Sequence, residues 1–112
     1  MRPLAELLAD IHLAISAVER RQPRNLDELL ADELLQVWCV HHLQVIGEAA
    51  SKLPVSFKHE HAEVDWAAVI GIRHLLVHEY FDLDWEIVWR TVVDDLPRLK
   101  AWLDGLAETA AS

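Results

Sequence analysis

The feature that most constrains the fold is a helical repeat of apolar residues. Near the N-terminus these residues recur at intervals of three and four, as Leu4, Leu7, Leu8, Ile11, Ile15 and Val18. This spacing places them on one face of an α-helix, so residues 3–21 are predicted to form an amphipathic helix with one buried stripe. Pro23 helps to end that helix.

A second, longer helix is predicted from about Asn25 to Ser51. Asn25 followed three residues later by Glu28 is typical of a capping box with asparagine in the cap position. Three- and four-residue spacing then links Trp38, His41, Val45 and Glu48. Polar groups are therefore expected to enter the same broad stripe as packing groups. Residues 52–64 combine a proline with mixed charge and lack a sustained period, so they are predicted to be a connection.

A third helix is expected to begin after Asp65, which is placed to cap it. Its apolar stripe contains one cation, since the helical spacing groups Trp66, Val69, Ile70, Arg73 and Val77. Arg73 is thus predicted to lie on a face that otherwise packs.

The C-terminal part is predicted to hold one or two more helices. Asp82 and Asp84 mark a turn and a cap before a helix at about 85–94. Pro97 is tolerated in a first helical turn, so a fifth helix is expected to run to about Leu106. The apolar phase nevertheless continues across this break, through Trp85, Trp89, Val92, Leu96, Leu99 and Leu103. One kinked helix is therefore the alternative, and these tryptophans are interpreted as core residues.

The composition agrees with a small helical protein. The 112 residues are 53% hydrophobic and include only three glycines and four prolines, and no strand alternation, glycine-rich phosphate loop or internal repeat is present. We therefore predict an all-α, up-and-down bundle of four to five helices that forms a single domain over residues 1–112. No segment has the apolar length of a membrane span, and the only cysteine, Cys39, excludes an internal disulfide. A cytoplasmic protein with no membrane association is expected.

The charge argues against broad electrostatic binding of nucleic acid. The formal net charge is −9, whereas binding to many phosphates needs a basic surface. Any RNA site must therefore be local. The one basic concentration, Arg20, Arg21 and Arg24, is interpreted as cations that neutralise a helix C-terminus.

The stretch IRHLLVHEYF, residues 72–81, contains the side chains that could take part in catalysis: an arginine, two histidines and the only tyrosine of the sequence. On a continuous helix Tyr80 lies about 20° from Arg73, and His74 and His78 lie about 40° apart. Arg73 and His78 are separated by about 140°. They can converge if the arginine side chain bends round, if the helix ends near His78, or if a second copy of the chain supplies the partner group.

An arginine and a histidine suit the cleavage of RNA. The guanidinium offers a fixed fork of donors that fits a phosphate, and histidine exchanges protons near neutral pH. In metal-independent cleavage a 2′-hydroxyl attacks the adjacent phosphodiester, the histidine acts as acid or base, and the arginine stabilises the phosphoryl oxygens. On residue types alone, a salt-bridged arginine and a hydrogen-bonded histidine are the better explanation, because arginine and histidine five residues apart occur often by chance.

The stretch RHLLVHEYF resembles the Arg-x4-His-x-Tyr motif of the HepT-like toxins, within the HEPN superfamily. Three further stretches are similar to that family in its order and spacing: LQVIGEAASKLP, DWAAVIGIRH and DLDWEIVWRTVVDDLPRLK. The resemblance extends from about Asn25 to Lys100.

The resemblance implies a HEPN bundle that forms a homodimer, with the two motifs facing a shared cleft. It also implies a metal-independent endoribonuclease that needs no cofactor, the toxin of a type VII-like toxin–antitoxin pair. Arg73 and His78 would be the catalytic pair. Tyr80 would be modified with AMP by a cognate minimal nucleotidyltransferase antitoxin. His74 replaces a polar residue that is often asparagine, and it is expected to orient the phosphate, join proton transfer or only pack.

Glu48 is a further candidate, either as a direct participant or through an ion pair that positions a nearby arginine or histidine. Two rival functions stay open. The first is a metal site built from His74 and His78, one helical turn apart, with ligands approaching from His41, His42 or Glu48. The second is a non-catalytic HEPN module that binds a nucleotidyltransferase. His59 and His61 are expected to be solvated.

Overall fold

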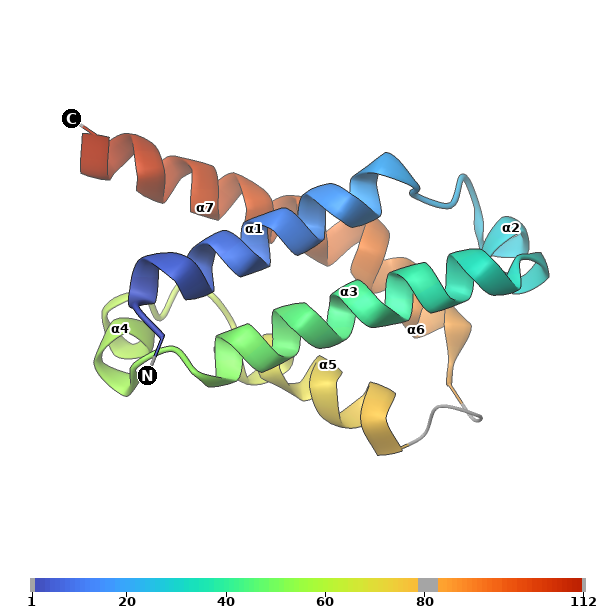
Figure 1. Ribbon diagram of the computed structural model, residues 1–112, viewed down its shortest axis with the longest axis horizontal. Helices are drawn as coiled ribbons and strands as arrows, with labels where there is room; N and C mark the ends of the chain where they lie inside the picture. Colours follow the sequence, from blue (N-terminus) through green and yellow to red (C-terminus); the bar gives the residue numbers. More distant parts are fainter. Residues whose placement is uncertain (1, 79–82, 112) are drawn as a thin grey trace.

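The chain forms an up-and-down helical bundle, as predicted (Figure 1). The structure is a computed structural model that describes residues 2–78 and 83–111, with side chains for residues 2–73 and 83–109. Helices α1, α3, α5 and the joined α6–α7 run alternately in opposite directions (Figure 1). Over the described ranges, no helix has the length and apolarity needed to cross a membrane.

Helix α1 spans Leu4–Arg20 and supplies much of the core. The predicted stripe is confirmed over most of its length, because Leu7, Ile11, Ile15 and Val18 are buried. Arg20 lies in the last turn, where a cation favours the helix dipole. Helix α1 packs beside α3 and contacts α7 through the ion pair Glu19–Lys100 (2.7 Å) and a hydrogen bond between His12 Nε2 and Asp104 Oδ1 (3.0 Å).

The predicted second helix is divided in two, so the single span from Asn25 to Ser51 was wrong. Helix α2 spans Leu26–Ala31 and α3 spans Glu33–Ser51. Asp32 between them has extended backbone, and its side chain accepts a hydrogen bond from the Leu35 amide at 3.1 Å. An aspartate that competes for backbone donors starts a new helix here, although the apolar spacing continues past it.

The N-terminal cap of α2 is confirmed, with a change in its second half. The Asn25 side chain accepts from the Glu28 amide at 2.8 Å. The Glu28 carboxylate reaches back to the Arg24 amide and guanidinium, at 3.2 and 2.7 Å, so the reciprocal partner lies one residue before the cap.

The inward face of α3 differs from the predicted stripe. Its buried residues are Leu35, Cys39, Val40, Leu43, Ile46, Gly47, Ala49 and Ala50. Trp38 and Val45 are half-buried at the edge of this face, while His41 and Glu48 are exposed. The polar groups therefore flank the packing face and do not enter it.

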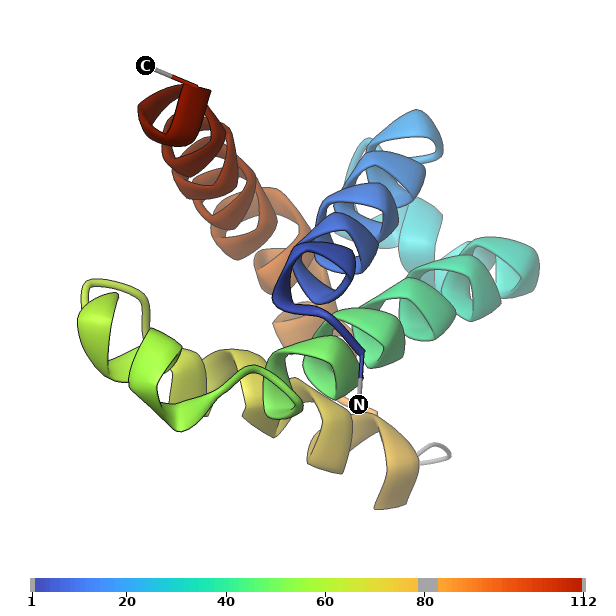
Figure 2. The ribbon, with the colours of Figure 1, turned by 60° about the vertical axis from the view of Figure 1, so that its left-hand side comes forward.

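The connection after α3 contains a short helix that lacked a sequence period. Helix α4 spans Val55–Glu60 and is anchored by the buried Phe57. Asp65 then caps α5, which spans Trp66–His78, by accepting from the Ala68 amide at 3.1 Å. Figure 2 shows α4 at one end of the molecule, where the chain turns from α3 into α5.

The C-terminal helices join through a π-helical turn, which favours the kinked-helix alternative over two separate helices. Helix α6 spans Trp85–Arg90, the π-turn spans Thr91–Asp95, and α7 spans Leu96–Ala111. Pro97 cannot donate to the carbonyl four residues before it and would clash there in a regular helix. The wider turn, in which the Leu96 amide bonds to the Thr91 carbonyl, relieves that conflict.

Helices α3 and α5 cross at very short range where Gly47 meets Arg73. A Cβ atom placed on Gly47 would lie 2.9 Å from Arg73 Cβ and 3.0 Å from the Arg73 backbone nitrogen. Only glycine leaves room for this approach, since any side chain would meet the backbone of α5. The crossing thus sets where Arg73 emerges.

An aromatic cluster fixes the other end of α5. Phe57, His61, Trp66 and Trp102 meet edge to face or tilted, with neighbouring ring centroids 4.5–6.2 Å apart. The indole of Trp102 also donates to Glu63 at 2.7 Å. The cluster ties α4, α5 and α7 together. His61 is half-buried in it, so the expectation that this histidine is solvated was wrong.

We predict opposite effects for two glycine-to-alanine substitutions. Gly47→Ala should destabilise the fold by about 1–2 kcal/mol, because overpacking at the helix crossing outweighs a helix-propensity gain of about 1 kcal/mol. Gly105→Ala is the matched control: it lies inside α7 with nothing within 4 Å of an added Cβ. It should stabilise by roughly 0.5–1 kcal/mol. Urea unfolding midpoints measure both, and equal shifts in one direction would contradict the close crossing.

A second prediction concerns Cys39, which is fully buried in α3. Burial raises the pKa of its thiol to about 11, so little thiolate exists at pH 8. Alkylation by iodoacetamide at pH 8 should therefore be at least about 10²-fold slower in the native protein than in urea. Mass spectrometry follows the reaction, and equal rates in both conditions would show that Cys39 is accessible.

Candidate functional site

Arg73 lies on α5 with its guanidinium turned toward the last turn of α3. Its Nη1 atom is 3.3 Å from Glu48 Oε2 and 3.1 Å from Ser51 Oγ. The arginine side chain keeps 29% of its accessible surface, and the Glu48 side chain keeps 50%. The pair is thus a partly exposed cation held at the surface where two helices cross. The ion-pair interpretation of Glu48 has the geometry that it requires.

Ser51 is a contact of Arg73 that was not predicted from the sequence. Its hydroxyl donates to the Glu48 carbonyl at 2.7 Å and accepts from Arg73 Nη1. A serine one turn after Glu48 at a helix end was the available signal. Such a serine usually bonds to its own helix, however, and nothing local indicates a contact with α5.

Among the residues with described side chains, none binds the outer edge of the Arg73 guanidinium. The side chain donates to Glu48 and Ser51 from Nη1, and no acceptor within the described ranges is hydrogen-bonded to Nε or Nη2. These two nitrogens form the side of the guanidinium that binds a phosphate or carboxylate through two parallel hydrogen bonds. The arrangement can therefore receive an anion without breaking the contacts to α3.

The other motif residues are placed only in part. His74 and His78 lie on α5 with Arg73, but their side chains fall outside the described residues, as does Tyr80 altogether. The structure brings Arg73 and Glu48 together, and the catalytic and regulatory roles of all five residues stay predictions. On a regular helix the five-residue spacing keeps Arg73 and His78 on different faces, about 140° apart.

Two histidines of α3 differ in environment. The His42 ring packs against Trp38 and His41, with centroid distances of 4.5 and 4.8 Å. Burial, with smaller contributions from His41 and Arg20, lowers the pKa of His42. Its Nε2 atom is buried and has no hydrogen-bond partner among the described residues. His42 is therefore a neutral packing group, whereas His41 and His59 are exposed.

The side chains that the structure describes give no support to the metal-site hypothesis. No group of three or more histidine, cysteine, aspartate or glutamate side chains there is placed to hold a metal ion. His74 and His78, on which that hypothesis rests, lie outside those side chains. A site that includes them stays a prediction.

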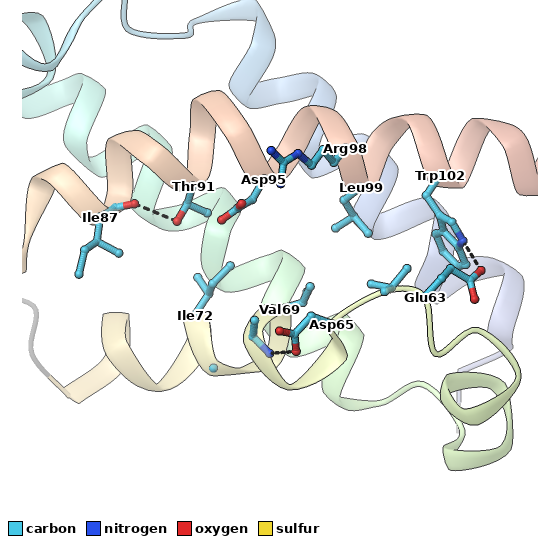
Figure 3. A pocket seen from close by; sticks show the side chains of 13 residues that line it. Glu63, Asp65, Val69, Ile72, Ile87, Thr91, Asp95, Arg98, Leu99 and Trp102 are labelled. Atoms are coloured by element: carbon cyan, nitrogen blue, oxygen red, sulfur yellow. Dashed lines mark hydrogen bonds between the residues drawn. The ribbon is translucent and has the colours of Figure 1, made fainter.

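A groove of about 710 Å³ lies between α5 and the α6–α7 helix (Figure 3). Its wall on α5 includes Ala68, Val69, Gly71 and Ile72, and the opposite wall includes Ile87, Thr91, Asp95, Arg98, Leu99 and Trp102. The walls are mainly apolar, and the Thr91 hydroxyl is already bonded to the Ile87 carbonyl at 2.9 Å. Arg73 does not line this groove. We therefore place the candidate chemistry at the crossing of α3 and α5.

Comparison with known proteins identifies relatives along most of the chain. Residues 11–105 match the family model described as "Ribonuclease HepT-like". "Putative RNase TTE0752" of Caldanaerobacter subterraneus is 34% identical over 83 residues, which cover 74% of each chain. "Probable ribonuclease HepT" of Thermococcus cleftensis is 33% identical over 102 residues, covering 90% of this chain and 93% of the relative.

A third relative, "Putative RNase MJ1380" of Methanocaldococcus jannaschii, is 27% identical over 88% of this chain and 92% of its own length. No solved structure matches the chain significantly. The family match covers α3, α5 and the crossing that holds Arg73, and the helical bundle is of the HEPN type. The chain belongs to the HepT-like ribonuclease family.

Proposed function

We propose that this protein is an endoribonuclease that cleaves RNA without a metal ion and acts as the toxin of a toxin–antitoxin pair. The observation that carries the proposal is the guanidinium of Arg73, which Glu48 and Ser51 bind on one side and no other described side chain binds on the opposite side. A fixed and accessible cation of this kind supplies the charge that a phosphoryl group gathers during cleavage. Membership of a ribonuclease family supports RNA as the substrate.

In the proposed reaction a ribose 2′-oxygen forms a bond to the adjacent phosphorus. The bond from phosphorus to the 5′-oxygen of the next nucleotide breaks, which leaves a 2′,3′-cyclic phosphate and a 5′-hydroxyl. The 2′-hydroxyl proton goes to a base and the leaving oxygen receives one from an acid, and His78 serves as one of these two groups. Arg73 binds the non-bridging oxygens, and His74 is assigned no required proton transfer.

The proposal includes a homodimer with the two Arg73 sites in a shared cleft. Helix α5 supports the homodimer, since its sequence WAAVIGI is apolar on every side. Within one chain the described residues do not fully cover this apolar surface, because Ala67 and Ala68 are exposed and Val69, Ile70 and Ile72 are only partly buried. A helix that is apolar all round is normally covered, so a second protein surface is expected beside α5. A second copy of the chain would also bring a second His78 toward Arg73.

Such a cleft would also offset the acidity of the whole chain. Two guanidinium groups held close together act on a phosphate over a few ångströms, whereas exposed carboxylates beyond about 8–10 Å are largely screened. A net charge of −9 is thus compatible with a local RNA site. The same charge and the apolar α5 also suit a non-catalytic module that binds a nucleotidyltransferase, which is the second candidate.

The mutational prediction is that Arg73→Ala and His78→Ala each lower RNA cleavage by about 10²-fold or more. His74→Asn should retain most of the activity. Cleavage of labelled RNA is measured together with the helical circular dichroism signal and the mass in solution, which should show a dimer in every variant.

Arg90→Ala is the matched control, because Arg90 is exposed on α6 and its one ion pair among the described residues is with Glu86, one turn away. It should leave cleavage unchanged. If His74→Asn abolishes activity while His78→Ala spares it, the histidine assignment is wrong. If the unmodified protein has no activity at any concentration, the non-catalytic module is favoured.

The regulatory prediction concerns Tyr80, two residues after His78. We propose that a cognate minimal nucleotidyltransferase transfers AMP to it: the phenolic oxygen bonds to the α-phosphorus of ATP, pyrophosphate leaves, and the phenolic proton passes to solvent. The added phosphate would be attracted to Arg73 and exclude the RNA phosphate from it. Incubation with the antitoxin, ATP and Mg²⁺ should add AMP at Tyr80 and reduce cleavage in proportion.

Tyr80→Phe separates this chemical switch from inhibition by complex formation. The variant should keep most of its ribonuclease activity, because the hydroxyl has no assigned proton transfer, and it should escape neutralisation. Peptide mass spectrometry locates the modification. Neutralisation without any AMP on Tyr80 would refute the switch.

A further inference from the structure

We propose that Ser51 is the positioning residue that fixes the orientation of the Arg73 guanidinium, so that its Nε–Nη2 edge is presented to one phosphoryl group of the RNA. The role of the phosphate rests on the proposed function. The positioning itself rests on the contacts at the end of α3.

The hydroxyl of Ser51 can act toward Arg73 only as an acceptor. Its single proton is directed to the Glu48 carbonyl at 2.7 Å, which fixes the rotamer and leaves a lone pair for Arg73 Nη1 at 3.1 Å. Because Ser51 is the last residue of α3 and is bonded to its own helix, this acceptor does not swing freely. It is a fixed point for the guanidinium.

Glu48 alone would hold the arginine less tightly. Its carboxylate lies 3.3 Å away on a side chain that keeps half of its surface exposed, and exposed pairs of this kind contribute little. A second carboxylate in place of Ser51 would bind the cation more strongly but repel the incoming phosphate. A neutral hydroxyl fixes the orientation and adds no negative charge.

Together these acceptors occupy one corner of the guanidinium. Nη1 carries two N–H groups, and Glu48 and Ser51 supply one acceptor for each. The remaining edge carries the Nε–H and Nη2–H donors, whose spacing matches two oxygens of one phosphate. Gly47 holds the base of the side chain through the close contact with Arg73 Cβ. The side chain is therefore fixed at both ends.

The test compares Ser51→Ala with Ser51→Thr and with Ser56→Ala, a matched control on an exposed position of α4. With ¹⁵N-labelled arginine, nuclear magnetic resonance measures rotation of the Arg73 guanidinium, and the Arg73 signals are assigned through Arg73→Ala. Rotation should be hindered in the unmodified chain and in the Thr and Ser56 variants, and free in Ser51→Ala. Unchanged rotation in Ser51→Ala would overturn the proposal.

A double-mutant cycle tests the functional consequence. Ser51→Ala should lower the rate of RNA cleavage by about 10-fold, because Arg73 loses one hydrogen bond that orients its guanidinium toward the phosphate. In an Arg73→Ala background it should cost nothing further, and Ser51→Thr should restore the rate. An equal loss in both backgrounds would mean that Ser51 only supports the fold, which refutes positioning.

The two hypotheses fail in different ways. If Arg73→Ala leaves RNA cleavage unchanged, the proposed function of Arg73 is wrong, and with it the role of the phosphate. The guanidinium rotation still decides whether Ser51 orients the side chain, because that measurement involves no RNA.

Discussion

The contact between Gly47 and Arg73 determines how the rest of the candidate site is arranged. It lets α5 approach α3 until Arg73 Cβ and the backbone nitrogen are within 2.9 and 3.0 Å of where a Gly47 side chain would begin. At that distance the arginine leaves the helix interface beside Glu48, the residue after Gly47, and Ser51, one turn further along α3. A wider crossing would move the guanidinium out of reach of both. Gly47 therefore determines both how closely the two helices pack and where the Arg73 guanidinium lies.

Much of the fold could be predicted because it follows from local rules. Asn25, Asp65 and Asp84 cap the helices that they were expected to begin, and the stripe of α1 is buried. The failures arise where a local preference competes with a continuing apolar pattern. Asp32 interrupts an apolar run to start α3, and Pro97 widens a turn without ending the helix. Helix α4 is too short to show a period.

The candidate site was less predictable, since its parts meet only in three dimensions. Helical spacing placed Arg73 on a packing face but could not select which residues of α3 lie opposite. Glu48 was identified as a partner for a nearby arginine or histidine, while Ser51 and the steric role of Gly47 depend on the crossing itself. The parts played by His74, His78 and Tyr80 stay predictions, carried by the motif in the sequence and not by described side-chain geometry.

Arg73 is proposed to serve a metal-independent cleavage of RNA in which the 2′-hydroxyl is the nucleophile. The most direct measurement is the chemistry of the product ends after the purified protein acts on a defined RNA in excess chelator. We expect cleavage under these conditions, with 2′,3′-cyclic phosphate and 5′-hydroxyl ends, and no cleavage of the same RNA carrying 2′-O-methyl groups. Products with 5′-phosphate ends, or activity that disappears with the metal, would contradict it.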